Sequence, residues 1–331
     1  MLNKKKWTGI CIAGIFFAVI FVIFFGNESW IQASSGLDNR RPYVAVIAKS
    51  KDSAFWRSVF SGVNAAATEY NLTVTFEGPE NEEDYETQNQ LIDQAVENRA
   101  EVIVFSAVDY NANAEAIDRA AKQGVKIVVI DSDVNSEQVS CRISTNNYEA
   151  GRMAGEYAIA NDDVYYVGIV NFDKNTANGQ QREAGFRDVA ETREEITIID
   201  SVNVRSSIED AKEATMIMLR QHPQIDVLAT FNEWTSLGVG YAIQEMGLED
   251  TIEVIAFDSH VVSVGMLETG EVDALVVQNP YAMGYLGVEC AYELINGLPV
   301  DHEEVDTSTI LVTKENMYDI ECQRLLFSFD E

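Results

Sequence analysis

The chain has 331 residues, of which 47% are hydrophobic, and its 54 acidic and 23 basic residues give a formal net charge of −31. That length suffices for two domains with substantial cores. The charge excludes a nucleic-acid-binding role, because such a surface repels phosphate backbones. It is typical of a solubilising extracellular surface.

The N-terminus predicts a membrane anchor. Three lysines at positions 4–6 precede an uncharged run at 7–26, which is about as long as a bilayer-spanning helix. The leading lysines place residues 1–6 in the cytoplasm and the rest of the chain outside, after a polar linker at 27–42. A cleavable signal is the alternative, since Ala33-Ser34-Ser35 is a suitable small-residue stretch.

Two series of apolar strands alternate with helical patterns after the linker. The first series has strands at Tyr43–Ala48, Leu72–Phe76, Val102–Phe105 and Ile127–Ile130, with helices at Trp56–Tyr70, Tyr85–Asn98 and Asn113–Gln123. The second has strands at Tyr165–Val170, Ile196–Val202, Val227–Phe231, Val254–Phe257 and Ala274–Val277, with helices at Gln180–Thr192, Ile208–Gln221, Thr235–Glu245 and Val262–Leu267. Continuous apolar strands alternating with helices predict two doubly wound α/β domains with parallel sheets. Facing strand ends would form a cleft between them.

Residues at these strand ends suit a small hydroxylated ligand. Phe55 and Trp56 offer flat apolar faces on which the C–H patches of a sugar can stack. Asp131 and Asp258 end equivalent strands of the two series, and a carboxylate can accept two hydroxyl hydrogen bonds. Asn232 and Gln278, which end two further strands, supply both donors and acceptors.

Arg182 is predicted in the first turn of the helix at 180–192, where a cation opposes the helix dipole. Such a position needs a compensating partner. A guanidinium fork aimed into the cleft and a salt bridge to a nearby acid are the two interpretations.

Catalysis and cofactors find little support in the sequence. No nucleotide-binding glycine motif, P-loop or nucleophile elbow is present, and His222, His260 and His302 lack metal-ligand spacing. We therefore expect no cofactor, no metal and no enzymatic activity. The acid pair Asp131 and Asp258 leaves a glycoside-processing enzyme as an alternative. Cys141, Cys290 and Cys322 lie outside the apolar N-terminal run, so one disulfide could form among them.

From about Arg41 to Asn316 the chain resembles the type 1 periplasmic binding proteins, in their ribose/galactose-type sugar-binding branch. The resemblance is carried in order by Ser53-Ala54-Phe55-Trp56, Val129-Ile130-Asp131, the stretch from Thr145 to Gly155, Gln181-Arg182-Glu183-Ala184-Gly185-Phe186, Phe231-Asn232-Glu233, Ala256-Phe257-Asp258 and Val277-Gln278-Asn279-Pro280. It implies two lobes, 43–145 plus 279–307 and 146–278 plus 308–331, joined by a three-strand hinge. It also implies eight ligand contacts: Ser53, Phe55, Trp56, Asp131, Arg182, Asn232, Asp258 and Gln278.

The same resemblance implies a partner and a place of action. A protein of this kind would close around a monosaccharide or related polyol at the cell surface and deliver it to the permease of an ABC importer. A sugar-sensing partner of a membrane histidine kinase and an autoinducer-2-type receptor are the alternatives. The chain departs from its ribose-binding relatives at Ser132, where they usually carry arginine, and at Ser53, where they carry asparagine.

Overall fold

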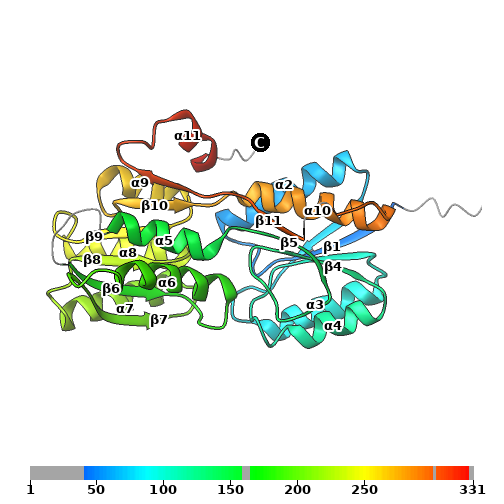
Figure 1. The fold of residues 1–331 in the computed structure, drawn as a ribbon, viewed down its shortest axis with the longest axis horizontal. Helices are drawn as coiled ribbons and strands as arrows, with labels where there is room; N and C mark the ends of the chain where they lie inside the picture. The colour runs from blue at the N-terminus through cyan, green and yellow to red at the C-terminus, as the bar shows by residue number, and fades with distance from the viewer. Residues whose placement is uncertain (1–40, 159–164, 301–302, 328–331) are drawn as a thin grey trace, which may run out of the picture. The chain divides into compact units, whose positions relative to one another are not determined.

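The computed structural model describes residues 41–158, 165–300 and 303–327, which form two parallel-stranded sheets with helices on both faces (Figure 1). The predicted α/β class with two doubly wound sheets is therefore confirmed. The predicted cytoplasmic tip at 1–6, the membrane segment at 7–26 and nearly all of the linker lie outside the described residues.

The first sheet has six strands in the order β11-β5-β4-β3-β1-β2, and every pairing in it is parallel. The strands are β1 (Tyr43–Ile47), β2 (Thr73–Glu77), β3 (Val102–Phe105), β4 (Lys126–Ile130), β5 (Val139–Ser144) and β11 (Glu304–Asp306). Helices α2 (Ala54–Glu69) and α10 (Pro280–Asn296) cover one face. Helices α3 (Tyr85–Glu97) and α4 (Ala114–Lys122) cover the other. We call this sheet with its helices the first lobe.

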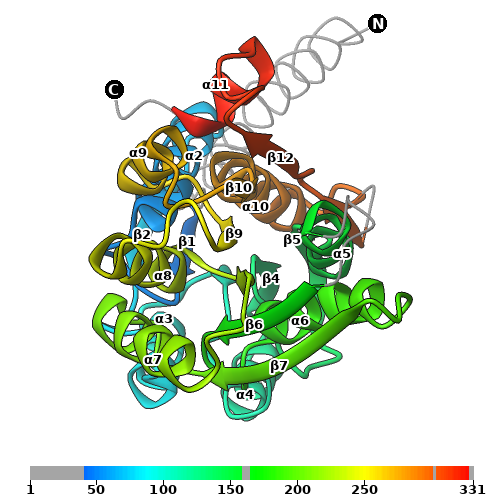
Figure 2. The same cartoon turned by 90° about the vertical axis from the view of Figure 1, so that its left-hand side faces the viewer.

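The second sheet repeats the arrangement in the order β12-β10-β9-β8-β6-β7. Its strands are β6 (Tyr165–Asn171), β7 (Ile196–Asn203), β8 (Val227–Thr230), β9 (Glu253–Phe257), β10 (Ala274–Val277) and β12 (Ile310–Thr313), and only the edge strand β12 is antiparallel to its neighbour. Helices α5 (Asn147–Ala158) and α6 (Ala177–Ala190) pack on one face. Helices α7 (Ile208–Gln221), α8 (Glu233–Met246), α9 (Val261–Thr269) and α11 (Ile320–Leu326) pack on the other (Figure 2). We call this the second lobe.

The apolar strands are buried on both faces, because their successive side chains pack alternately against the two layers of helices. In β1, Val44 and Val46 pack toward α2 and α10, whereas Ala45 and Ile47 pack toward α3 and α4. Successive side chains of a strand point to opposite faces. A strand covered on both sides must therefore be apolar throughout, as the sequence pattern indicated.

Helix α10 follows β10 of the second sheet but belongs to the first lobe, where it packs closely against α2. A Cβ added at Gly62 of α2 would lie 2.1 Å from the carbonyl oxygen of Tyr281, and one at Gly284 of α10 would lie 2.0 Å from that of Val59. Both contacts are far below van der Waals distance, so only glycine allows the two helix backbones to approach this closely.

The chain passes between the two sheets at three places: at 145–146 after β5, at 278–279 after β10, and at 307–309 between β11 and β12. In each lobe the strand order reverses between two neighbouring central strands, β1 and β3 in the first and β6 and β8 in the second. Such switch points are where open α/β sheets bind ligands, outside the carboxyl ends of the strands.

Two sequence expectations need revision. Helix α6 begins at Ala177 and not at Gln180, which puts Arg182 in its second turn. The weak helix formers Asn178 and Gly179 hid this start. The three cysteines of the described part, Cys141, Cys290 and Cys322, are all buried and unbridged.

In the described ranges, no helix combines the length and the apolar character that crossing a membrane requires.

Candidate functional site

A single small cavity is lined by all eight residues singled out in the sequence. Its volume is about 30 Å³, which is close to the share of one water molecule. The wall residues come from the segments that follow β1, β2, β4, β6, β8, β9 and β10 and from helices α2, α6 and α8. They are Ser53, Phe55, Trp56, Asp131, Arg182, Asn232, Asp258 and Gln278, joined by Lys49, Glu82, Phe172, Asn178, Glu233 and Trp234.

The aromatic part of the wall is held by the start of α2. Ser53 is the N-cap, and its hydroxyl oxygen accepts a hydrogen bond of 3.1 Å from the backbone N–H of Trp56. Trp56 is only 1% exposed, and its indole Nε1 donates to Oε1 of Glu82 at 3.0 Å. Phe55 meets the Trp56 ring edge-on, with centroids 5.1 Å apart. This rigid pair presents an apolar surface to the cavity.

Asp131 and Asp258 share an unusual backbone conformation, with φ of 56° and 69°. Left-handed φ is unfavourable for residues other than glycine, although aspartate tolerates it better than most. Backbone strain of this kind tends to cluster at functional sites. The Asp131 carboxylate accepts hydrogen bonds from Ser106 Oγ at 2.9 Å and Asn178 Nδ2 at 3.1 Å.

Arg182 is fully buried and joins several parts of the site. Its Nε donates to Asn147 at 2.8 Å, Nη1 to the Phe231 carbonyl at 2.7 Å, and Nη2 to Oε1 of Gln278 at 2.7 Å. The guanidinium carbon also lies 4.9 Å from the centre of the Phe257 ring. Burial lowers the pKa of Arg182, and the carboxylates of Asp258 and Asp131 oppose that shift.

Gln278 and Asn232 already use most of their hydrogen-bonding groups within the protein. Gln278 accepts from the Thr145 hydroxyl at 2.9 Å and donates from Nε2 to Asp258 at 2.6 Å. Asn232 is the N-cap of α8 and forms a capping box with Thr235. Both side chains therefore hold the site together, in addition to lining the cavity.

The sequence model of a protein family described as a periplasmic binding protein domain matches residues 44–299, which is most of the chain. The chain belongs to the periplasmic binding protein family. Its similarity extends to curated relatives with low identity over most of their length. The D-ribose/D-allose-binding protein of Pseudomonas aeruginosa is 25% identical over 82% of this chain and 89% of that protein. The D-apiose import binding protein of Actinobacillus succinogenes is 24% identical over 79% and 82%.

Solved structures of solute-binding proteins resemble the chain closely in fold, although their sequence identity to it is low. A carbohydrate transporter solute-binding protein from Agrobacterium radiobacter, in complex with D-arabinose, gives a TM-score of 0.84 at 28% identity, covering 87% of this chain and all of that one. An ABC transporter solute-binding protein from Agrobacterium vitis with bound D-fucose gives 0.83 at 26% identity, covering 86% and 100%. These relatives are named as binding proteins, and the chain is a binding protein of their family and not an enzyme.

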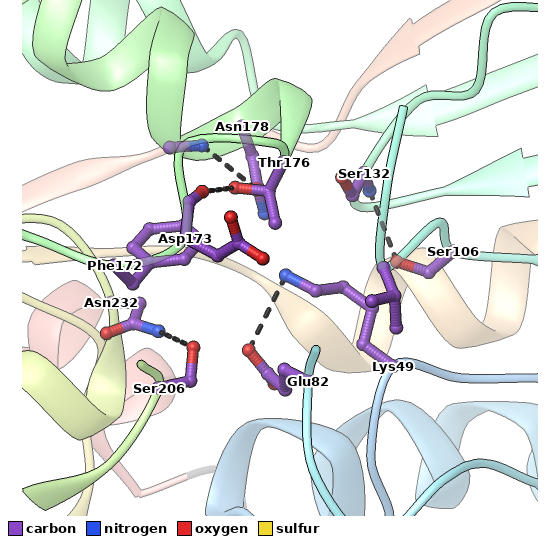
Figure 3. A network of polar contacts seen from close by, with 12 residues as sticks. Lys49, Glu82, Ser106, Ser132, Phe172, Asp173, Thr176, Asn178, Ser206 and Asn232 are labelled. Atoms are coloured by element: carbon purple, nitrogen blue, oxygen red, sulfur yellow. Dashed lines mark hydrogen bonds and ion pairs between the residues drawn. The ribbon is translucent and has the colours of Figure 1, made fainter. Parts of the chain in front are cut away.

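In this periplasmic binding protein, an ion pair that sequence reasoning missed lies in the cavity wall. Lys49 Nζ is 3.5 Å from Oε2 of Glu82, and both side chains are less than a tenth exposed. The same ammonium group lies 5.2 Å from the centre of the Phe172 ring, which belongs to the second lobe. Figure 3 shows the Asp173 carboxylate pointing into the same space. In the sequence, Glu82 is part of an acidic loop that looks like a solvated turn.

A second missed residue, Glu233, bonds the lobes together. It is the first residue of α8, and its two carboxylate oxygens accept the backbone N–H groups of Ala54 at 3.1 Å and Phe55 at 2.9 Å. Those groups begin α2, where the helix dipole favours a negative charge. Burial raises the pKa of Glu233 to about 7; the hydrogen bonds from Phe55 and Ala54 oppose the rise, while nearby Asp258 and Glu82 add to it.

Other contacts also join the two lobes across the cavity. Asn178 of the second lobe donates to Asp131 of the first, and the backbone N–H of Ser206 donates to Oε1 of Glu83 at 2.7 Å. No group of three or more His, Cys, Asp or Glu side chains arranged to hold a metal ion occurs in the part of the chain that the structure describes.

Proposed function

We propose that this chain is a cell-surface solute-binding protein whose lobes close around a monosaccharide and deliver it to an ABC importer. The observation that carries the proposal is one cavity walled by aromatic faces, carboxylates, amides and a guanidinium from both lobes. Further support comes from relatives named for ribose, allose and apiose, and from solved neighbours holding D-arabinose and D-fucose.

The chemistry of the wall matches a neutral polyol. Hydroxyl groups of the ligand would donate to the carboxylates of Asp131 and Asp258 and accept from Arg182. The apolar face of the ring would stack on Phe55 and Phe172. Each hydrogen bond between a ligand hydroxyl and one of these carboxylates contributes about 1.5–3 kcal/mol to the free energy of binding.

Binding requires the lobes to part, because the cavity of about 30 Å³ holds no more than a water molecule. The segments at 145–146, 278–279 and 307–309, where the chain passes between the sheets, are the hinge in this proposal. Opening would break the hydrogen bonds from Ala54 and Phe55 to Glu233 and expose the wall to a ligand.

The proposal includes tethering by residues 7–26, with residues 1–6 in the cytoplasm and both lobes outside. Its support is the uncharged run of bilayer-spanning length after three lysines. Protease treatment of intact cells should remove the lobes and leave a short membrane-bound fragment. Release of both lobes into the medium without protease treatment would instead indicate a cleaved signal.

A thermal-shift screen of the purified chain against pentoses, hexoses, inositols and autoinducer-2 tests the function. A ligand at a hundred times its dissociation constant stabilises the folded chain by about 2.7 kcal/mol. Asp131→Asn keeps the shape of the wall but loses the charge, so affinity for that ligand should fall about 10–100-fold. The matched control is Asp93→Asn, on the exposed face of α3, where Asp93 pairs with Arg119; it should bind normally.

Two outcomes would refute the proposal. One is the absence of any stabilising sugar, together with unchanged affinity of Asp131→Asn for a ligand found by other means. The other is turnover of a glycoside by the wild-type chain that Asp131→Asn abolishes, which would indicate an enzyme.

A further inference from the structure

An apolar face surrounds α11 and adjoins the cavity between the lobes. Ile320 is 72% exposed, Val261 69%, Tyr318 66% and Phe327 38%. Helix α11 buries Cys322 and Leu326 against the core of the second lobe. Ile320, Arg324 and Phe327 recur at helical spacing on its other side. A contiguous apolar patch on an otherwise highly charged protein indicates an interaction surface.

Helix α11 contributes to the walls of two adjoining hollows. The larger, of about 650 Å³, is lined by the starts of α2 and α9 and by Ile320, Leu326 and Phe327. It shares Phe55, Glu233, Asp258 and Gln278 with the cavity between the lobes. The other, of about 530 Å³, is lined by residues of α2 and α10 and by Glu321 and Leu325. The helix is therefore a ridge with a hollow on either side. A ridge flanked by grooves can pack against a second copy of itself.

Charges on this face come in complementary sets. Arg57 and Arg324 are exposed at the larger hollow, and within the described ranges neither has a carboxylate within ion-pair distance; Arg57 donates only to the backbone carbonyl of Asp52. Asp319 and Glu321 flank the exposed Ile320 and are themselves exposed. One apolar segment with acidic neighbours thus lies beside a hollow whose exposed charged residues are two arginines, while the acidic side chains of Glu233 and Asp258 in the same wall are buried.

We propose that two copies of this chain associate through this face, each placing its segment 318–321 in the hollow of the other. Such an interface is isologous, so every contact occurs twice. A lipid surface fits less well, because membranes attract Lys and Arg, and this segment presents Asp319 and Glu321. The long-range repulsion between two chains of net charge −31 is screened within about 8 Å at physiological ionic strength.

Sedimentation equilibrium of the full chain in detergent over a range of concentrations tests the proposal. Wild type should form dimers, and Ile320→Asp should raise the dimer dissociation constant at least ~100-fold, because the apolar burial is lost twice. Arg324→Glu should raise it about tenfold or more by placing like charges together. The matched control is Leu298→Asp, which alters a residue 48% exposed outside both hollows and should dimerise as wild type does.

A cross-linking measurement locates the contact directly. In a Cys11→Ser background, Ile320→Cys should link two copies with a short bis-maleimide, since Cys141, Cys290 and Cys322 are buried. Leu298→Cys should not do so. Circular dichroism of each variant establishes that it is folded.

Three results would overturn the proposal. The wild-type chain could remain monomeric at the highest concentration reached. Its dimers could persist unchanged in Ile320→Asp and Arg324→Glu, which would indicate association through another surface. Ile320→Asp could instead weaken binding to phosphatidylglycerol vesicles with no change in oligomeric state, which would assign the face to a membrane.

Discussion

The carboxylate of Glu233 should make closure of the lobes depend on pH. In the closed arrangement its pKa is raised from the usual 4.5 to about 7, chiefly by burial. When the lobes part, water reaches the group and its pKa should return toward the usual value. The difference corresponds to roughly 3 kcal/mol between the charged and neutral forms.

The sign follows from the direction of the shift. A carboxyl group whose pKa is higher in the closed arrangement takes up a proton on closing, so closure is favoured as pH falls through 7 and the gain levels off near 4.5. Ligand affinity is coupled to closure. It should therefore increase by up to about a hundredfold between about pH 8 and about pH 5.

Isothermal titration calorimetry with the sugar found in the screen provides the assay. Glu233→Gln stays neutral at every pH and should abolish the dependence, with an affinity near that of wild type at low pH. Glu233→Ala removes the acceptors of the Ala54 and Phe55 N–H groups and should weaken binding at every pH, by about 1–3 kcal/mol for each unpaired donor.

A matched control separates this effect from titration elsewhere. Burial also raises the pKa of Glu253 to about 7, but this residue begins β9, at the opposite end of the strand from Asp258. Glu253→Gln should keep the pH dependence of affinity. The reasoning is refuted if wild-type affinity is constant or rises with pH across this range, or if Glu233→Gln retains the wild-type profile.

Two further substitutions test the packing and the buried cation. Gly62→Ala should lower the free energy of unfolding, measured in urea, by at least about 2 kcal/mol, because its Cβ would overlap the Tyr281 carbonyl. The control is Gly265→Ala, whose Cβ meets nothing within 4 Å and which should be neutral or stabilising. Equal effects of the two substitutions would contradict the close packing of α2 and α10. Arg182→Lys should lower the free energy of unfolding by about 3 kcal/mol and reduce sugar affinity, because an ammonium cannot satisfy the three acceptors around the guanidinium. The control is Arg187→Lys, on the same helix in a partly exposed ion pair with Glu183, which should change little. A normal melting temperature for Arg182→Lys would be inconsistent with this role.

Strands buried on both faces were the elements that sequence patterns predicted best. The bounds of β3 and β10 agree residue for residue with their apolar runs. Strand β5 has no such run, because its alternating Val-Ser-Cys-Arg-Ile-Ser is only half buried. The short strands β11 and β12 owe their pairing to neighbours far away in the sequence, which local periodicity does not reveal.

The candidate site could be predicted only where the sequence carries a positional signal. Asp131, Asp258 and Gln278 directly follow buried strands, which identifies one edge of a sheet. Glu82 and Glu233 gave no comparable signal, since their partners are a distant indole and the backbone of another lobe. Trp56 offered one indirect hint, because a buried indole N–H requires an acceptor.

The left-handed backbone at Asp131 and Asp258 has a consequence for engineering this protein as a biosensor. Asparagine and glycine are the residues that adopt this conformation at little cost, so a library randomised at these two positions would consist mostly of unstable variants. Lys49 and Asn178 lack positive φ and contact the same cavity. Ligand preference should therefore be altered from those two positions, with both aspartates left in place.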